Sequence, residues 1–172
     1  MIPMARPQEI LLPVTTTLIV VTVVGALLVN LVPLPVLVSE ARPDFCALVL
    51  VYWGIHQPRR VGFTIAFLLG LSIDIVDASL FGQHALVYVV LMFAAIALHR
   101  RVLNFSLVGQ SLHIVPLLVA GELIATAVRL LAGDELPAPA HFFGPLIGAL
   151  LWIPLSVLFR LPRLPKTGGD RV

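Results

Sequence analysis

The sequence predicts an all-α membrane protein, a compact bundle of six transmembrane helices with both termini in the cytoplasm. Of the 172 residues, 59% are hydrophobic and only 12% are charged, and the mean hydropathy is +1.05. A soluble domain of this size needs far more polar surface to cover its core. The apolar residues also gather in long runs between short polar or basic segments. The solvent of this chain is therefore expected to be lipid.

Six apolar runs are candidates for membrane spans, because a bilayer core of about 30 Å needs about 20 helical residues. They are residues 10–32, 45–55, 61–80, 85–98, 105–131 and 142–159. The first run is too long for the core of a signal peptide and is expected to remain as a helix. The second and fourth are short, but a helix shielded by its neighbours need not cross the whole bilayer. Residues 1–161 are predicted to form one domain, and residues 162–172 a flexible cytoplasmic tail.

Residues near the span ends support individual boundaries. The threonines at 15–17 are placed inside the first helix, where each hydroxyl can bond a carbonyl one turn back. Three prolines between residues 33 and 43 are expected to stop that helix and shape an external loop. Tyr52 and Trp53, close to the end of the second span, are interpreted as aromatic anchors at the membrane interface.

The basic residues test the number of crossings. With six crossings, nine of them fall on one side of the membrane: Arg6, Arg59, Arg60, Arg100, Arg101, Arg160, Arg163, Lys166 and Arg171. The positive-inside rule then places both termini in the cytoplasm. Removing either short span from the count would put basic groups on both sides. Because these residues form short groups between apolar runs, they are not a nucleic-acid signal.

Two carboxylates interrupt the third apolar run. Asp74 and Asp77 are three residues apart and therefore share one helix face. A carboxylate facing lipid costs about 2.5–3.5 kcal/mol on insertion scales. Both side chains are therefore expected to face the bundle interior, water or a partner.

The fifth span carries Glu122 and Arg129 at matching depths in the outer half of the membrane. We therefore predict a polar seam between the third and fifth helices that opens outward and is formed by Asp74, Asp77, Glu122 and Arg129, with an Asp77–Arg129 ion pair as the pair to test. Three roles remain open for these charges: structural pairing within the bundle, contact with a partner or ligand, and a proton or ion relay.

Motifs for chemistry are weak in this sequence. The single cysteine, Cys46, excludes an internal disulfide. Two aspartates without a third nearby carboxylate are a poor metal site, and no nucleophile elbow, phosphate-binding loop or zinc-protease pattern occurs. His84 is interpreted as a turn residue at the interface. Gly144 and Gly148 form a GxxxG step that allows close helix packing, within the bundle or with a partner helix. We therefore expect neither catalysis nor a cofactor or metal.

One stretch of the sequence resembles the MreD family of rod shape-determining proteins. The likeness is close over about residues 42–101 and lies elsewhere mainly in hydropathy. The matching residues are the entry Arg42-Pro43-Asp44-Phe45, the Tyr52-Trp53 pair, the turn Arg60-Val61-Gly62, the helix from Gly70 to Asp74, the block Leu80-x-Gly82-Gln83-His84-Ala85-Leu86, and the turn His99-Arg100-Arg101. Asp74 fits the family pattern better than Asp77, whose position is less strictly acidic there.

The resemblance implies a non-enzymatic, multipass component of the bacterial inner membrane. It would belong to the machinery that elongates the cell wall of rod-shaped cells and help to organise peptidoglycan synthesis. The implied partners are the bitopic protein MreC, the actin-like MreB filament, and RodA with its penicillin-binding transpeptidase, besides membrane lipids. The implied fold is similar to the substrate-binding subunits of energy-coupling-factor transporters. A small-molecule-binding subunit of a transporter is the alternative, because an outward polar seam would suit it too.

Overall fold

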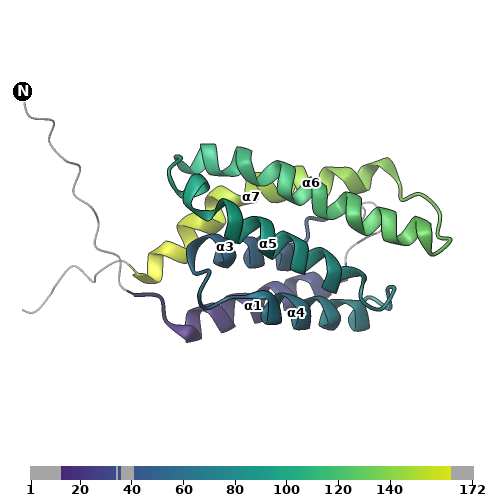
Figure 1. Ribbon diagram of the computed structural model, residues 1–172, viewed down its shortest axis with the longest axis horizontal. Helices are drawn as coiled ribbons and strands as arrows, with labels where there is room; N and C mark the ends of the chain where they lie inside the picture. Colours follow the sequence, from purple (N-terminus) through teal and green to yellow (C-terminus); the bar gives the residue numbers. More distant parts are fainter. Residues whose placement is uncertain (1–12, 34, 36–40, 164–172) are drawn as a thin grey trace, which may run out of the picture.

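The computed structural model describes residues 13–33, 35 and 41–163, and in these residues every regular element is helical. The described residues form six α-helices and two short 3₁₀-helices (Figure 1). The elements are α1 (Thr16–Leu31), α3 (Phe45–His56), α4 (Phe63–Val76), α5 (Gln83–Leu103), α6 (Leu107–Leu131), η1 (Pro139–Phe142), α7 (Phe143–Arg160) and η2 (Leu161–Arg163). The prediction of an all-helical chain with six helices is confirmed for this part of the chain.

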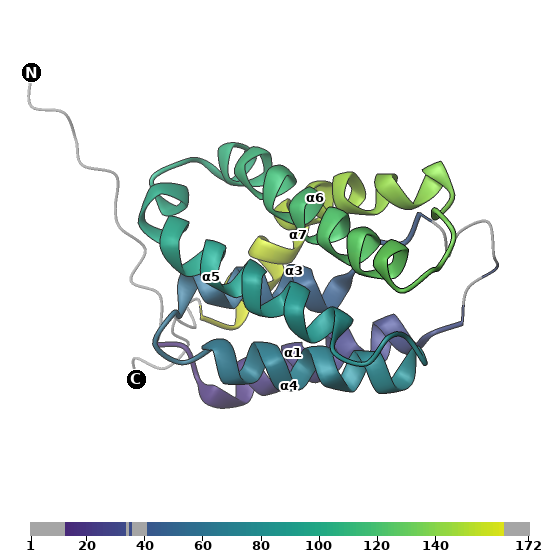
Figure 2. The ribbon, with the colours of Figure 1, turned by 45° about the vertical axis from the view of Figure 1, so that its right-hand side comes forward.

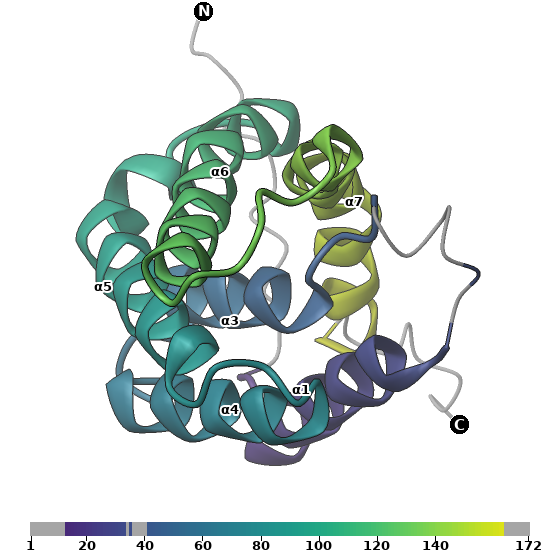
Figure 3. The same ribbon diagram turned by 90° about the vertical axis from the view of Figure 1, so that its right-hand side faces the viewer.

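Helix α3 lies at the centre of the bundle. Figure 3 shows it surrounded by α1, α4, α5, α6 and α7. All ten residues from Cys46 to Ile55 are buried. With 12 residues the helix is about 18 Å long, shorter than the hydrocarbon core. The short second span is therefore a core helix that its neighbours shield.

Within the described residues, three helical segments are long and apolar enough to cross a membrane: Gln83–Leu103, Leu107–Leu131 and Pro139–Arg160. The fourth predicted span, residues 85–98, is therefore too short by seven residues. The helix begins at Gln83 and continues through the basic residues Arg100 and Arg101. Basic residues are favourable near a helix C-terminus, where the backbone carbonyls are unpaired.

Helix α1 begins later than predicted. Residues 13–15 are not helical, and the side chain of Thr15 accepts a hydrogen bond from the Leu18 N–H at 3.3 Å. Thr15 is therefore the N-cap, a position at which a threonine oxygen satisfies an orphan donor of the first turn. The start predicted at Ile10 lies outside the described residues. Pro13 favours this later start because proline lacks the backbone N–H that a helix interior uses and is best tolerated near a helix N-terminus.

The aromatic residues of α3 are core residues, so their interpretation as interfacial anchors is wrong. Tyr52 and Trp53 are fully buried. The ring of Phe159 on α7 stacks on Trp53 with centroids 5.7 Å apart, and Tyr52 meets Trp152 at 5.6 Å. Trp53 Nε1 also donates a hydrogen bond to Thr22 Oγ1 of α1 at 2.9 Å. The cluster thus joins α1, α3 and α7.

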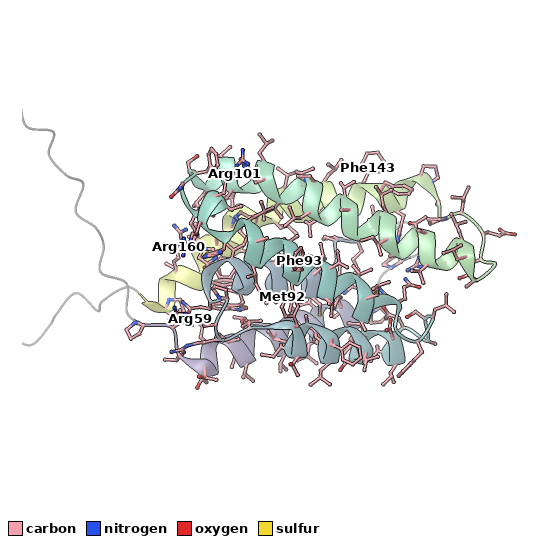
Figure 4. All side chains as sticks on the ribbon, viewed as in Figure 1. Arg59, Met92, Phe93, Arg101, Phe143 and Arg160 are labelled. Carbon is pink, nitrogen blue, oxygen red and sulfur yellow. The ribbon has the colours of Figure 1, made fainter. Side chains whose placement is uncertain are left out.

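The outer surface of the bundle is apolar. Large side chains are exposed on several helices, including Phe93 (64% exposed), Leu112 (73%) and Leu150 (70%). Figure 4 shows Phe93 on the outside of the bundle midway along its length. A surface of this kind would aggregate in water, and it is the surface that a lipid environment favours.

The charged residues divide between the two ends of the bundle. Figure 4 shows Arg59, Arg101 and Arg160 at one end and Phe143 toward the other. The described acids other than Glu122, which lies within α6, are in or near the opposite connections, in α4–α5, α6–η1 and before α3. Figure 2, turned by 45°, shows that successive connections lie at alternating ends of the bundle. The structure therefore places the Arg59 and Arg101 turns on the same end.

Candidate functional site

A cavity of about 270 Å³ lies at the end of the bundle opposite the basic turns. All six α-helices, or the connections at their ends, contribute to its wall. The polar residues of the wall are Asn30, Arg42, Asp44, Asp77, His84, Glu122, Arg129 and His141. Apolar side chains such as Ile73, Leu91 and Leu118 complete it. A concave wall that combines apolar side chains with converging polar groups is typical of a binding site.

Asp44 organises the wall on the side of α3. Its side chain caps this helix by accepting a hydrogen bond from the Ala47 N–H at 3.0 Å. The same oxygen accepts from Asn30 Nδ2 of α1 at 3.0 Å, and the other oxygen accepts from the Tyr88 hydroxyl of α5 at 2.7 Å. Asn30 Oδ1 in turn accepts from the Phe45 N–H at 3.2 Å. One carboxylate therefore ties three helices together.

Asp74 is buried and holds the α4–α5 connection in place. One carboxylate oxygen accepts hydrogen bonds from the His84 N–H at 2.9 Å and from Ser79 Oγ at 3.1 Å, and lies 2.8 Å from His84 Nδ1. The other oxygen accepts from the Gly82 N–H at 2.8 Å. The chain must fold back to bring these donors to Asp74. Helix α4 consequently ends at Val76, four residues before the predicted end.

The arrangement of Ser79, His84 and Asp74 is not that of a catalytic triad. Both the serine oxygen (3.4 Å) and the aspartate oxygen (2.8 Å) face the same imidazole nitrogen, Nδ1. A relay needs the nucleophile on one ring nitrogen and the carboxylate on the other. The three residues therefore form a turn, in which His84 also contributes to the cavity wall.

Gly70 and Gly82, two residues of the MreD-like pattern, make the α4–α5 connection possible. A Cβ on Gly70 of α4 would lie 2.4 Å from the backbone of Ala85, so only glycine allows α4 and α5 this close. Gly82 has φ +95°, a conformation that favours glycine. The motif residues from 70 to 84 thus specify one tight joint between two helices.

The structure contains only part of the predicted polar seam. Asp77, Glu122 and Arg129 contribute to the wall of the same cavity, whereas Asp74 does not. The expected Asp77–Arg129 ion pair is absent among the described residues, so that expectation is wrong for this structure. The partners of Glu122 and Arg129 come from other segments.

Each of these two partners lies at the cavity end, Gln83 at the start of α5 and His141 in η1. His141 Nε2 of η1 lies 2.9 Å from Glu122 Oε1. The amide oxygen of Gln83, oriented toward Arg129, accepts from Nε at 3.0 Å and from Nη2 at 3.2 Å. Gln83 is the first residue of α5 and lies next to the Asp74 turn, so its amide oxygen, and not the Asp77 carboxylate, contacts the guanidinium.

The GxxxG step of α7 packs inside the bundle. A Cβ on Gly144 would lie 2.8 Å from the Arg42 carbonyl oxygen. One on Gly148 would lie 3.1 Å from a Leu118 methyl group and 3.5 Å from Pro43 Cβ. The two glycines therefore seat the segment before α3 against α7. Arg42 is held there by a hydrogen bond from Nη1 to the Val32 carbonyl at 2.8 Å.

Sequence reasoning missed four polar residues of this region: Asn30, Gln83, Tyr88 and His141. Asn30 and Tyr88 stand as polar groups in apolar runs, a signal that could have indicated them. Gln83 and His141 lie outside the predicted spans, where a polar residue is ordinary. In the described part of the chain, no group of three His, Cys, Asp or Glu side chains is arranged to hold a metal.

Comparison with known proteins adds a family to this geometry. The family model described as rod shape-determining protein MreD matches residues 11–161. The rod shape-determining protein MreD of Haemophilus influenzae is 30% identical over 135 residues, which cover 78% of this chain and 83% of the relative. No solved structure matches this chain. The expected likeness to substrate-binding subunits of energy-coupling-factor transporters therefore stays a prediction.

Proposed function

Because the chain belongs to the MreD family of rod shape-determining membrane proteins, we propose that it is a non-catalytic, multipass component of the inner-membrane machinery for cell elongation. In this proposal it helps to organise peptidoglycan synthesis by binding MreC. The observation that carries the proposal is the polar cavity formed by the ends of all six α-helices.

The distribution of arginines supports an orientation in the membrane. The Arg59, Arg101 and Arg160 end is assigned to the cytoplasm, because Lys and Arg are retained on that side. The cavity then opens toward the periplasm. In this orientation all six helices count as crossings, with α3 shielded by its neighbours, and both termini are cytoplasmic.

The cavity fits a partner better than a reaction. The described residues form almost no mass outside the helix bundle, so this part of the chain offers a partner its helix surfaces and short connections. We assign the cavity to the membrane-proximal part of MreC. The basic turns at the other end are available to anionic lipid, to the MreB filament, or to the cytoplasmic parts of RodA and its transpeptidase.

A small-molecule-binding transporter subunit is the second candidate, because a cavity with mixed polar and apolar walls also suits a ligand. Its volume of about 270 Å³ lies just under the roughly 300–1,000 Å³ of typical ligand sites. A side chain or short peptide segment needs less room, which favours the partner assignment.

Site-directed photocrosslinking tests the proposal. A crosslinking amino acid at Asp77 or Glu122, in the cavity wall, is expected to capture MreC in living cells. The same residue at Phe93, on the outer surface, is the matched control and is expected to capture lipid or nothing. Capture of MreC equally from both positions would contradict the cavity assignment. Rods that stay rods after depletion of the protein would contradict the role in elongation.

A further inference from the structure

The charges in the cavity wall do not neutralise one another. Five formally charged residues line it: the acids Asp44, Asp77 and Glu122 and the bases Arg42 and Arg129. No ion pair within the described residues joins any of the acids to either arginine. Unpaired charges in a partly closed site are costly, so such a wall favours an occupant that supplies the missing partners.

Most of these groups already have a neighbour. Asp44 accepts three hydrogen bonds from Asn30, Ala47 and Tyr88. Glu122 meets His141, and the Arg129 guanidinium meets the Gln83 oxygen.

Two groups of opposite sign remain for an occupant. The Asp77 carboxylate, at the end of α4, is exposed and has no hydrogen-bond or ion-pair partner among the described residues. Arg42 donates from Nη1 to a backbone carbonyl, and its buried Nε has no partner within the described part of the chain. Among these residues the wall therefore offers one free acceptor and one free donor.

We infer that the cavity recognises a polypeptide segment that presents a basic side chain to Asp77 and a carboxylate or main-chain carbonyl to Arg42. This inference rests on the proposed function, since the segment belongs to the partner bound there. A polypeptide satisfies both contacts together, because a carbonyl follows every side chain.

The test is a charge reversal in the full-length protein, co-expressed with full-length MreC and purified in detergent. Asp77→Lys is expected to weaken MreC binding roughly tenfold or more, since it places like charges together. Asp134→Lys is the matched control: it makes the same change in charge on an exposed residue at the same end, outside the cavity wall. The control is expected to bind within about twofold of the unmodified protein.

Two further arms make the inference specific. Asp77→Asn is expected to weaken binding less than Asp77→Lys and to flatten its salt dependence, because an ion pair is screened by salt. Reversing one membrane-proximal Lys or Arg of MreC to Glu is expected to restore binding to the Asp77→Lys protein. The described residues give Asp77 no hydrogen-bond or ion-pair partner, so unfolding temperatures of these variants are expected to match the unmodified protein.

The outcomes separate the inference from the proposed function. If the unmodified protein does not bind MreC, the proposed function fails and the inference fails with it. If the unmodified protein binds but Asp77→Lys and Asp134→Lys bind equally well, only the inference fails. A phospholipid that co-purifies with the unmodified protein and is lost in Asp77→Lys, with MreC binding unchanged, also overturns it and assigns the contact to a zwitterionic lipid headgroup.

Discussion

Replacing Asp74 with alanine is expected to destabilise the protein strongly. The carboxylate accepts hydrogen bonds from the backbone N–H groups of Gly82 and His84 at 2.8 and 2.9 Å, from Ser79 Oγ at 3.1 Å, and pairs with His84 Nδ1 at 2.8 Å. The side chain is buried. Alanine leaves two backbone donors without a partner, and each such donor costs about 1–3 kcal/mol. The expected loss is therefore about 2–6 kcal/mol of the free energy of unfolding.

Thermal unfolding of the purified protein measures this loss. Trp53 and Trp152 are fully buried, so their fluorescence reports the exposure of the core. For a chain of this length, 1 kcal/mol corresponds to about 2–4 °C, so a decrease of at least about 4 °C is expected. Asp74→Asn keeps one acceptor oxygen but turns an amide N–H₂ toward donors, and an intermediate decrease is expected.

The matched control is Asp77→Ala, three residues further along the same chain segment. Asp77 has no hydrogen-bond or ion-pair partner among the described residues, so its removal is expected to change stability by less than about 0.5 kcal/mol. Equal unfolding temperatures for the Asp74 and Asp77 variants would refute the assignment of Asp74 as the residue that holds the α4–α5 connection.

Two further substitutions test the packing and the cavity wall. Gly70→Ala is expected to lower the amount of folded protein in membranes, because a Cβ would lie 2.4 Å from the Ala85 backbone and overpacking of this kind costs about 1–3 kcal/mol or more. Gly25→Ala is the control: nothing lies within 4 Å of its Cβ, so the free energy of unfolding is expected to stay the same or rise by up to about 1 kcal/mol. Equal amounts of the two folded variants would contradict the close α4–α5 contact. Tyr88→Phe removes the hydroxyl that donates to Asp44 at 2.7 Å and is expected to cost about 1.5–3 kcal/mol by thermal unfolding; an unchanged unfolding temperature would show that this hydrogen bond does not stabilise the bundle.

Hydropathy predicted the number of helices among the described residues, but it placed several boundaries wrongly. The end of α4 depends on the hydrogen bonds that Asp74 accepts from Ser79, Gly82 and His84. A reversal of the chain of this kind leaves no periodic pattern of apolar residues in the sequence. The predicted fourth span, residues 85–98, left out Gln83, although this residue begins α5. Local hydropathy thus indicates that a helix exists, whereas side-chain partners decide where it ends.

The cavity shows the same limit for the site residues. Matching depths in the membrane placed Asp77, Glu122 and Arg129 at one end of the bundle, and the structure has all three in one cavity wall. Their pairing could not be predicted, because Gln83 and His141 come from segments outside the two helices compared. Tyr52 was misassigned for a similar reason: its burial depends on Trp152, which is 100 residues away in the sequence.

Cysteine labelling tests most directly the central claim that the basic turns and the cavity lie on opposite faces of the membrane. Cys46 is buried and is replaced first, to give a background without a natural thiol. Single cysteines are then placed at Arg59, Arg101 and Asp134. The account predicts that a membrane-impermeant maleimide labels position 134 in intact cells and labels positions 59 and 101 only after the inner membrane is opened. Labelling of 59 and 101 from opposite faces, or of 134 from the same face as both, would contradict the six crossings and the outward-facing cavity.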